Sequence, residues 1–282
     1  MAEFFAPAKI NLWLHIFAPD QTGYHPLDSL FCAIDLADHL DIVPARTGTL
    51  EFAVTGADVG PHESNLAYRA AREFYAACGL APQVAISLHK NIPAGGGLGG
   101  GSSDVATVLA ALNQLHDGVL PDSDLFAIAA RIGSDVPFFL CGSPLAHASG
   151  RGQLLQARPP LARAPVLLAV PPFAIATASA YRWLDEARAY CAREVAPGAA
   201  TNWQDVARNA HNDFEDVLFP KHPLLHALKQ AIGESGALIA LLSGSGSACF
   251  GVFDSRNTRD TAQASLNQQF PQVQLIATST RM

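Results

Sequence analysis

The sequence predicts a mixed α/β (α+β) protein of two domains. Strand-like and helix-like stretches alternate along its 282 residues without an internal repeat, which is typical of chains that pack helices against sheets. The length exceeds the roughly 100–150 residues of a common domain. Three prolines interrupt the segment 156–165, which has neither helical nor strand periodicity and therefore indicates a linker. We place the domains at residues 1–158 and 159–282.

In the first domain, one helix has clear signals at both ends. The apolar pattern of 64–79 predicts a helix with Ser64 as its N-cap and Gly79 as its stop. Alternation of apolar residues predicts the strands around it. The further expected elements are a strand over 5–17, a strand over 83–90 with Val84, Ile86 and Leu88 on one face, and a helix over 122–133 that ends at Gly133.

A glycine-rich loop follows the strand over 83–90. Six of the seven residues from Gly95 to Gly101 are glycine, although each glycine costs about 0.5–1 kcal/mol in regular structure. After the loop, an apolar stripe predicts a helix with Ser102 or Ser103 as its N-cap. The stripe consists of Val105, Val108, Leu109 and Leu112.

Two interpretations of the loop are open, a flexible connection and a backbone cradle for phosphate oxygens at a helix N-terminus. Its position between a strand and a helix favours the cradle. The loop has Gly101 where a Walker A motif has lysine, and no acidic residue follows at the distance expected for a Rossmann dinucleotide site. The sequence therefore indicates another kind of nucleotide-phosphate fold.

The elements of the second domain follow the order of a split βαβ, or ferredoxin-like, unit. A strand, several helices, two strands around a glycine-rich turn, a helix and a final strand are expected. Their ranges are 166–170 for the first strand, 178–236 for the helices, 237–242 and 248–253 for the paired strands, 243–247 for the turn, 259–270 for the last helix and 273–277 for the last strand.

Composition excludes several classes of protein. The formal net charge of −7 gives no electrostatic footprint for nucleic acid. No apolar run approaches the roughly 20 residues of a membrane span, and the N-terminus does not read as a signal peptide, so we expect a cytoplasmic protein. The five cysteines are scattered without a CxxC pair, which predicts reduced, buried thiols and no metal ligands. The sequence does not decide between a monomer and a homodimer.

Three motifs resemble the signatures of the GHMP kinases. They are PAKINLWLHI at 7–16, PAGGGLGGGSSD at 93–104 and LSGSGSACFGVF at 242–253. Further stretches are similar to the members of this family that use 4-diphosphocytidyl-2-C-methyl-D-erythritol in the non-mevalonate (MEP) isoprenoid pathway. These stretches are GYHPLDSLF at 23–31, IGSDVPFFL at 132–140 and NDFE at 212–215, and the resemblance runs from about residue 5 to 255.

The resemblance implies a fold, an activity and its cofactors. The N-terminal lobe is expected to be like domain 2 of ribosomal protein S5, and the C-terminal lobe to be ferredoxin-like. The activity implied is transfer of the γ-phosphoryl group of ATP, with Mg²⁺, to the 2-hydroxyl of the erythritol moiety. The partners implied are ATP and this cytidine diphosphate sugar alcohol, both small molecules.

The ATP site implied by the resemblance contains the glycine loop and two residues outside it. The hydroxyls of Ser102 and Ser103 are the expected phosphate or magnesium contacts, and Asp104 is expected to be only a helix N-terminal residue. The full set is Pro93, Ala94, Gly95, Gly96, Gly97, Leu98, Gly99, Gly100, Gly101, Ser102, Ser103, Lys90 and Asn65. For Lys90 and Asn65, solvated roles at a strand end and a helix start remain open.

Lys9 and Asp135 are the catalytic residues that the resemblance implies. Asp135 lies at a turn beside an apolar run and could act as the base for the acceptor hydroxyl, although a turn aspartate that bonds its own backbone is the alternative. Lys9 could stabilise the developing charge on the hydroxyl oxygen. An edge lysine in solvent is the alternative for Lys9. Asn11 lies on the same strand face as Lys9 and is expected to share its site.

The acceptor's cytidine is expected to lie against Tyr24 and His25, two exposed loop residues whose rings suit stacking and hydrogen bonding. More loosely matched acceptor residues are Thr177, Asn212, Gly244 and Ser245. One departure from the family pattern is Gln153, where glutamate is expected. A kinase for another small alcohol and a non-catalytic nucleotide-binding protein are the two alternative functions.

Overall fold

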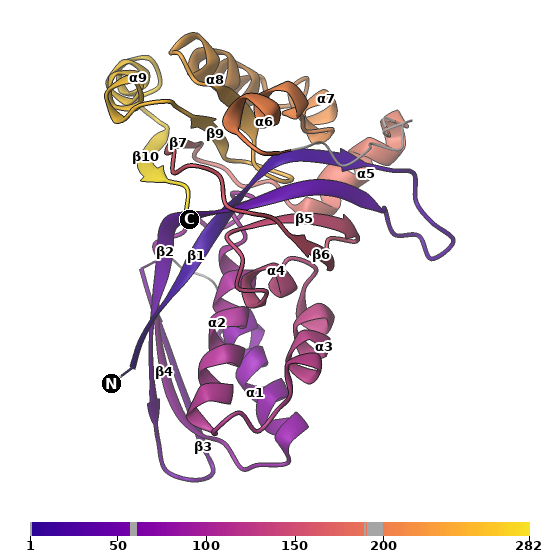
Figure 1. The fold of residues 1–282 in the computed structure, drawn as a ribbon, viewed down its shortest axis with the longest axis vertical. Helices are drawn as coiled ribbons and strands as arrows, with labels where there is room; N and C mark the ends of the chain where they lie inside the picture. The colour runs from indigo at the N-terminus through magenta and orange to yellow at the C-terminus, as the bar shows by residue number, and fades with distance from the viewer. Residues whose placement is uncertain (1, 57–60, 189, 191–199) are drawn as a thin grey trace. The chain divides into compact units, whose positions relative to one another are not determined.

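The computed structural model describes residues 2–56, 61–188, 190 and 200–282 (Figure 1). By its contacts the chain divides into two units, each built from segments that are not contiguous in sequence. Unit 1 comprises Met1–Ala8, Leu36–Ala94 and Gly99–Gly142, and unit 2 comprises Lys9–Asp35, Gly95–Leu98 and Ser143–Met282. The strands β1 (Ala2–Ile16) and β2 (Leu27–Pro44) contribute residues to both units.

Unit 1 packs helices on a small sheet. The end of β2 pairs antiparallel with β4 (Gln83–His89), and β4 pairs in parallel with β3 (Thr49–Thr55). The predicted inner face of β4 and the predicted stripe of α2 are both buried, which confirms the two periodicity assignments. The helical elements of unit 1 are η1 (His62–Ser64), α1 (Leu66–Cys78), α2 (Gly100–Leu115), α3 (Asp122–Ile132) and α4 (Val136–Leu140).

Two predicted helix caps are wrong. Asn65, and not Ser64, caps α1, because its side chain accepts a hydrogen bond from the backbone N–H of Ala67. The helix α2 begins two residues before the predicted serine caps, since Gly99 adopts the left-handed conformation (φ +72°) that ends the loop. Ser102 and Ser103 thus lie within the first turn of α2. The predicted stop of α1 at Gly79 (φ +67°) is confirmed.

Unit 2 begins with antiparallel pairs. The first half of β2 pairs with β5 (Leu145–Gly150), and β5 pairs with β6 (Leu154–Ala157). The strand β1 also pairs with β2. The C-terminus is held here as well, because Thr280 bridges to Ile34 and the backbone N–H of Arg281 donates to the carbonyl of Ala33.

The rest of unit 2 has the predicted ferredoxin-like arrangement. Its sheet has the order β10-β7-β9-β8 with antiparallel neighbours, and α8 and α9 pack on its strands (Figure 1). The strands are β7 (Pro165–Val170), β8 (Ile239–Leu242), β9 (Cys249–Val252) and β10 (Gln274–Ser279). The helices are α5 (Thr177–Ala187), α6 (Trp203–Asn209), α7 (Phe214–Leu218), α8 (Pro223–Glu234) and α9 (Arg256–Gln269).

The predicted boundary near residue 158 falls between β6 and β7, inside unit 2, and as a division of the chain into two domains it stays a prediction. In the described part of the chain, Cys32 and Cys249 are buried free thiols as expected, whereas Cys78 and Cys141 are partly exposed; Cys191 lies outside the described residues. Among the described helices, none combines the length and apolarity needed to cross a membrane.

Candidate functional site

Three of the predicted motifs meet in unit 2. The loop segment Gly95–Leu98 contacts the turn 243–248 through its carbonyl oxygens. The carbonyls of Gly95 and Gly96 accept hydrogen bonds from the backbone N–H groups of Ser247 (3.1 Å) and Ala248 (3.2 Å). The hydroxyl of Ser243 donates to the carbonyl of Gly97 (3.0 Å). The carbonyl of Leu98 accepts from the backbone N–H of Lys9 on β1 (2.9 Å).

This contact explains why Gly97 cannot carry a side chain. A Cβ at this residue would lie 2.0 Å from the carbonyl oxygen of Ser243, and its φ of +73° is unfavourable for other residues. At Gly95 (φ +68°) a Cβ would lie 2.7 Å from the Cβ of Ala174. Glycine is therefore required by close packing at Gly95 and Gly97, so a merely flexible connection is excluded.

The backbone N–H groups of the loop differ from its carbonyl oxygens in their hydrogen bonding. Over the residues that the structure describes, the backbone N–H groups from Gly95 to Ser102 have no protein acceptor, and the N–H of Ser103 begins the helical pattern by donating to Gly99. Unpaired N–H groups in a glycine-rich loop and at a helix N-terminus attract anions. The loop segment and the first turn of α2 therefore both present donors suited to phosphate oxygens.

Lys9 and Asn11 lie side by side on β1, as predicted. Lys9 is only 3% exposed, which excludes the edge lysine in solvent. Its Nζ donates to Oδ1 of Asn11 (2.6 Å) and lies 5.0 Å from the centre of the Phe31 ring. The Asn11 amide in turn donates to the hydroxyl of Ser29 (2.9 Å), which donates to the carbonyl of Trp13 (2.6 Å). This chain of bonds fixes the orientation of the Asn11 amide.

Sequence reasoning missed Ser29 and its neighbour Asp28. Asp28 accepts hydrogen bonds from the Trp13 indole (2.7 Å) and contacts Nε2 of His147 (2.5 Å). Both residues occur in the quoted stretch GYHPLDSLF, but their partners on β1 and β5 are remote in sequence. The side chains of Asp28 and Ser29 hold the beginning of β2 against β1. They thereby position Lys9 and Asn11 on β1.

Asn212 organises the turn that contacts the loop. It is fully buried, and its amide donates to the carbonyls of Leu242 and Gly244 (both 2.8 Å) while its Oδ1 accepts from the N–H of Phe214. Both amide protons and one lone pair of the amide oxygen are thus used within the protein, so Asn212 positions the turn, and its contact with a substrate stays a prediction. Thr177, which is exposed, bonds Ser245 in the same turn through their hydroxyl oxygens (2.8 Å).

Tyr24 and His25 differ from the predicted pair of exposed loop residues. Tyr24 is 55% exposed, and the guanidinium of Arg151 covers one face of its ring at 3.6 Å. The side chain of His25 is only 8% exposed, so for His25 the expectation is wrong. Its Nδ1 contacts the carbonyl of Phe17 (3.0 Å) and its ring stacks on Tyr181, which sequence reasoning missed.

In unit 1 a buried charge cluster lies at the start of α2. The ammonium of Lys90 contacts Asp38 and lies 2.6 Å from Oδ2 of Asp104. Asp38 also accepts from the backbone N–H groups of Asn91 (2.6 Å) and Ile92 (2.8 Å). Because the Lys90 ammonium is engaged by two carboxylates, the solvated strand-end interpretation is wrong, and its contact with a nucleotide stays a prediction.

Asp104 lies near the N-terminus of α2, as the sequence predicts, and it also belongs to the buried charge cluster. It is 3% exposed, and burial raises its pKa to about 7 against the opposing influence of Lys90. Its Oδ1 and the hydroxyl of the fully buried Ser103 are both without a hydrogen-bond partner in the described structure. Ser102 is partly exposed, so of the two serines it is the one accessible to a ligand.

The other predicted residues of unit 1 lie at helix starts. Asn65 caps α1, as described above, so the side-chain oxygen is used for the cap. Asp135 is partly exposed and immediately precedes α4. Its side chain makes no cap hydrogen bond to that helix, which disfavours the interpretation of a turn aspartate that only bonds its own helix.

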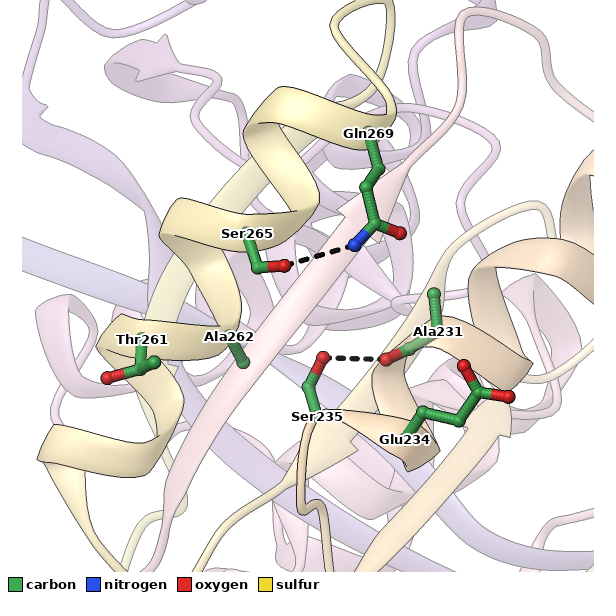
Figure 2. Close-up of a pocket in the computed structure, with 7 residues that line it drawn as sticks. All are labelled: Ala231, Glu234, Ser235, Thr261, Ala262, Ser265 and Gln269. Atoms are coloured by element: carbon green, nitrogen blue, oxygen red, sulfur yellow. Dashed lines mark hydrogen bonds between the residues drawn. The ribbon is translucent and has the colours of Figure 1, made fainter.

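A cavity of about 270 Å³ between α8 and α9 contains none of the predicted residues. Figure 2 shows its lining, in which polar groups bond within their own helix. The amide of Gln269 donates to the hydroxyl of Ser265 (3.0 Å), and the hydroxyl of Ser235 donates to the carbonyl of Ala231 (2.7 Å). These groups do not converge on a common point, so we do not assign the cavity a function.

Two family models match the chain. One describes the N-terminal domain of GHMP kinases and matches residues 65–143, and the other describes the C-terminal domain of GHMP kinases and matches residues 176–272.

Curated relatives match over nearly the full length. A protein of Deinococcus radiodurans named 4-diphosphocytidyl-2-C-methyl-D-erythritol kinase is 37% identical over 99% of this chain and 93% of its own. A protein of the same name from Solidesulfovibrio magneticus is 39% identical over 95% of this chain and 94% of its own.

Solved structures are similar as well. A crystal structure of 4-(cytidine 5'-diphospho)-2C-methyl-D-erythritol kinase has a TM-score of 0.84 and 33% identity, and all of each chain is covered. A homoserine kinase from Cytophaga hutchinsonii has a TM-score of 0.69 at 17% identity over 99% of this chain and 94% of its own, and shows the fold alone.

The loop contact predicts different effects for two neighbouring glycines. Gly97→Ala should lower the free energy of unfolding by more than about 2 kcal/mol, because the added Cβ collides with the Ser243 carbonyl and the backbone is strained. Gly96→Ala is the control, since its Cβ would meet only ordinary contacts at 3.5 Å, and should cost less than about 1 kcal/mol. Urea unfolding measures both, and equal losses would contradict the packing argument.

The raised pKa of Asp104 predicts that the stability of the fold depends on pH. Its folded pKa of about 7 lies above the ordinary aspartate value of 3.8, so the folded state retains a proton that the unfolded state releases. Its contribution is present below about pH 4 and is lost as the pH rises towards about 7, with a slope of at most about 1.4 kcal/mol per pH unit.

In Asp104→Asn the unfolding free energy should therefore decrease less between about pH 5 and about pH 7 than it does in the parent chain. Asp122 is an exposed aspartate at the start of α3. Its replacement, Asp122→Asn, is the matched control and should leave the pH profile of the unfolding free energy unchanged. A profile that Asp104→Asn does not alter would show that this carboxyl ionises normally.

Proposed function

This chain belongs to the GHMP kinase family, and from that membership we propose that it phosphorylates 4-diphosphocytidyl-2-C-methyl-D-erythritol at the 2-hydroxyl, with ATP as the donor and ADP as the second product. It would act in the non-mevalonate route to isoprenoid precursors, in the cytoplasm. The observation that supports phosphoryl transfer most directly is the row of unpaired N–H groups from Gly95 to Ser102.

ATP would bind through its phosphates to that row. The carbonyls of the loop are bonded to the turn 243–248 and to β1, so the peptide planes are held before any nucleotide arrives. Preorganised N–H donors stabilise charge without a further cost of reorientation. The positive end of the α2 dipole adds to the attraction.

Magnesium would accompany the nucleotide and neutralise charge on its phosphate oxygens. The protein fits an ion held largely by phosphate and water, because the carboxylate of Asp104 is already paired with Lys90. The accessible hydroxyl of Ser102, in the first turn of α2, is the protein oxygen that we assign to it.

We propose that Lys9 and Asp135 act on the acceptor hydroxyl. Asp135 would accept the hydroxyl proton as the oxygen attacks the γ-phosphorus, and the ammonium of Lys9 would stabilise the negative charge that develops on that oxygen. The Lys9 ammonium is held by Asn11, and the bond from Asn11 to Ser29 fixes the amide that holds it.

The cytidine of the acceptor would lie against the exposed ring of Tyr24. Arg151 already covers one face of this ring, which leaves the other face for a base. His25 and Tyr181 form a stacked pair at 5.1 Å within the same unit, and the partly exposed Tyr181 adds aromatic surface. Thr177 and Ser245 offer neighbouring hydroxyls to the polar part of the acceptor.

The test is a coupled assay of ADP release with magnesium-ATP and one acceptor at a time. We expect turnover with 4-diphosphocytidyl-2-C-methyl-D-erythritol and none with homoserine, mevalonate or galactose. Activity only with another alcohol would retain the kinase assignment and reject the acceptor. The absence of turnover with any acceptor, combined with ATP binding, would favour a nucleotide-binding protein that is not a kinase.

Asp135→Asn should lower kcat by about 10²–10⁴-fold, because the amide cannot accept the proton. Its affinity for ATP, measured by titration calorimetry, should remain within about twofold of the parent value, since the phosphate donors are backbone groups. Asp122→Asn is the control and should retain full turnover. Unchanged kcat in Asp135→Asn would remove Asp135 from the reaction.

A further inference from the structure

Three potential metal ligands gather in unit 2, outside the proposed phosphoryl-transfer residues. His15 is the last residue but one of β1, and His211 and Asp213 precede α7, almost 200 positions later in the chain. One ring nitrogen from each histidine and one carboxylate oxygen lie within 4.8 Å of one another. The two imidazole rings are stacked, with centroids 5.1 Å apart.

Backbone hydrogen bonds hold the two segments together. The N–H of Leu14 donates to the carbonyl of His211 (2.8 Å), and the N–H of Asp213 donates to the carbonyl of Leu14 (3.0 Å). Oδ2 of Asp213 accepts from the N–H of Ile16 (2.6 Å), which leaves Oδ1 directed to Nε2 of His211 at 2.6 Å. The carboxylate is therefore oriented by the main chain, as the carboxylate ligands of metal sites commonly are.

The ligand types select the class of ion. Two imidazole nitrogens and one carboxylate oxygen are the donors that zinc and similar transition metals take, whereas magnesium prefers oxygen alone. Ligand atoms about 2.0–2.2 Å from a tetrahedral zinc ion lie roughly 3.4 Å from each other, so the observed group must close by about 1.5 Å or less. The His211 side chain is 46% exposed and can turn.

We propose that His15, His211 and Asp213 form a binding site for Zn²⁺. The ion replaces the hydrogen bond between His211 and Asp213, and water completes its coordination. Access is open on the side of His211, and Asp213, whose side chain is 10% exposed, forms the inner wall. This inference does not depend on the proposed kinase activity.

Zinc at this position would tie β1 to the segment that carries Phe214. The Phe214 ring packs edge-to-face on Tyr181 with centroids 5.0 Å apart, and Tyr181 stacks on His25. Zinc should thus stiffen the aromatic group next to Tyr24. The phosphate-binding loop is not part of this chain of contacts.

The experiment is calorimetric titration of the full chain, freed of any histidine tag, with zinc chloride, followed by the absorbance of the cobalt(II) form. We expect one ion per chain and a visible absorbance typical of four-coordinate cobalt. His15→Gln and His211→Gln should each weaken binding by at least about tenfold. Magnesium chloride at the same concentrations should give no binding heat.

His39→Gln is the matched control. His39 belongs to a second group of potential ligands, with Glu3 and Asp41 in unit 1, and its replacement should leave zinc affinity unchanged. Thermal unfolding without metal checks that each variant folds, and the half-exposed His211 is the replacement least able to disturb the core. No binding, or binding that neither His15→Gln nor His211→Gln weakens, would overturn the proposal.

Discussion

The structure of the site depends on how the backbone of the glycine loop is divided between two tasks. From Gly95 to Leu98 every carbonyl accepts a hydrogen bond from within unit 2, three from the turn 243–248 and one from β1. The N–H groups of the same residues have no protein acceptor in the described structure. A segment with satisfied acceptors and unsatisfied donors is rigid and electropositive, which are the two properties that a phosphate site needs.

The two buried lysines have different neighbours in the structure. Lys90 lies between Asp38 and Asp104, and this group of charges fixes the strand end and the start of α2. The Lys9 ammonium donates to the Asn11 amide and lies over the Phe31 ring, so its position on β1 is fixed. An ammonium that is held in place can respond to charge that appears on a substrate.

The sequence predicted the order of elements, the ferredoxin-like sheet and the meeting of Lys9 with Asn11, because all of these follow from short-range periodicity or from quoted motifs. It could not predict what depends on distant pairs. The burial of Asp104 follows from Lys90 and Asp38, and the role of Ser29 follows from its position opposite Asn11. Ser64 and Asn65 are residue types that cap helices about equally well. The sequence alone therefore does not distinguish them, and only the observed backbone decides which of the two is the cap.

The interleaving of the two units affects how the chain can fold as it leaves the ribosome. Residues 9–35 belong to the unit that also contains the last residues of the chain, and Ile34 bridges to Thr280. At synthesis rates of about 5–20 residues per second, this early segment must wait tens of seconds or less for its final partners. Unit 1 ends at Gly142, so its core can form while the remainder of unit 2 is still being made.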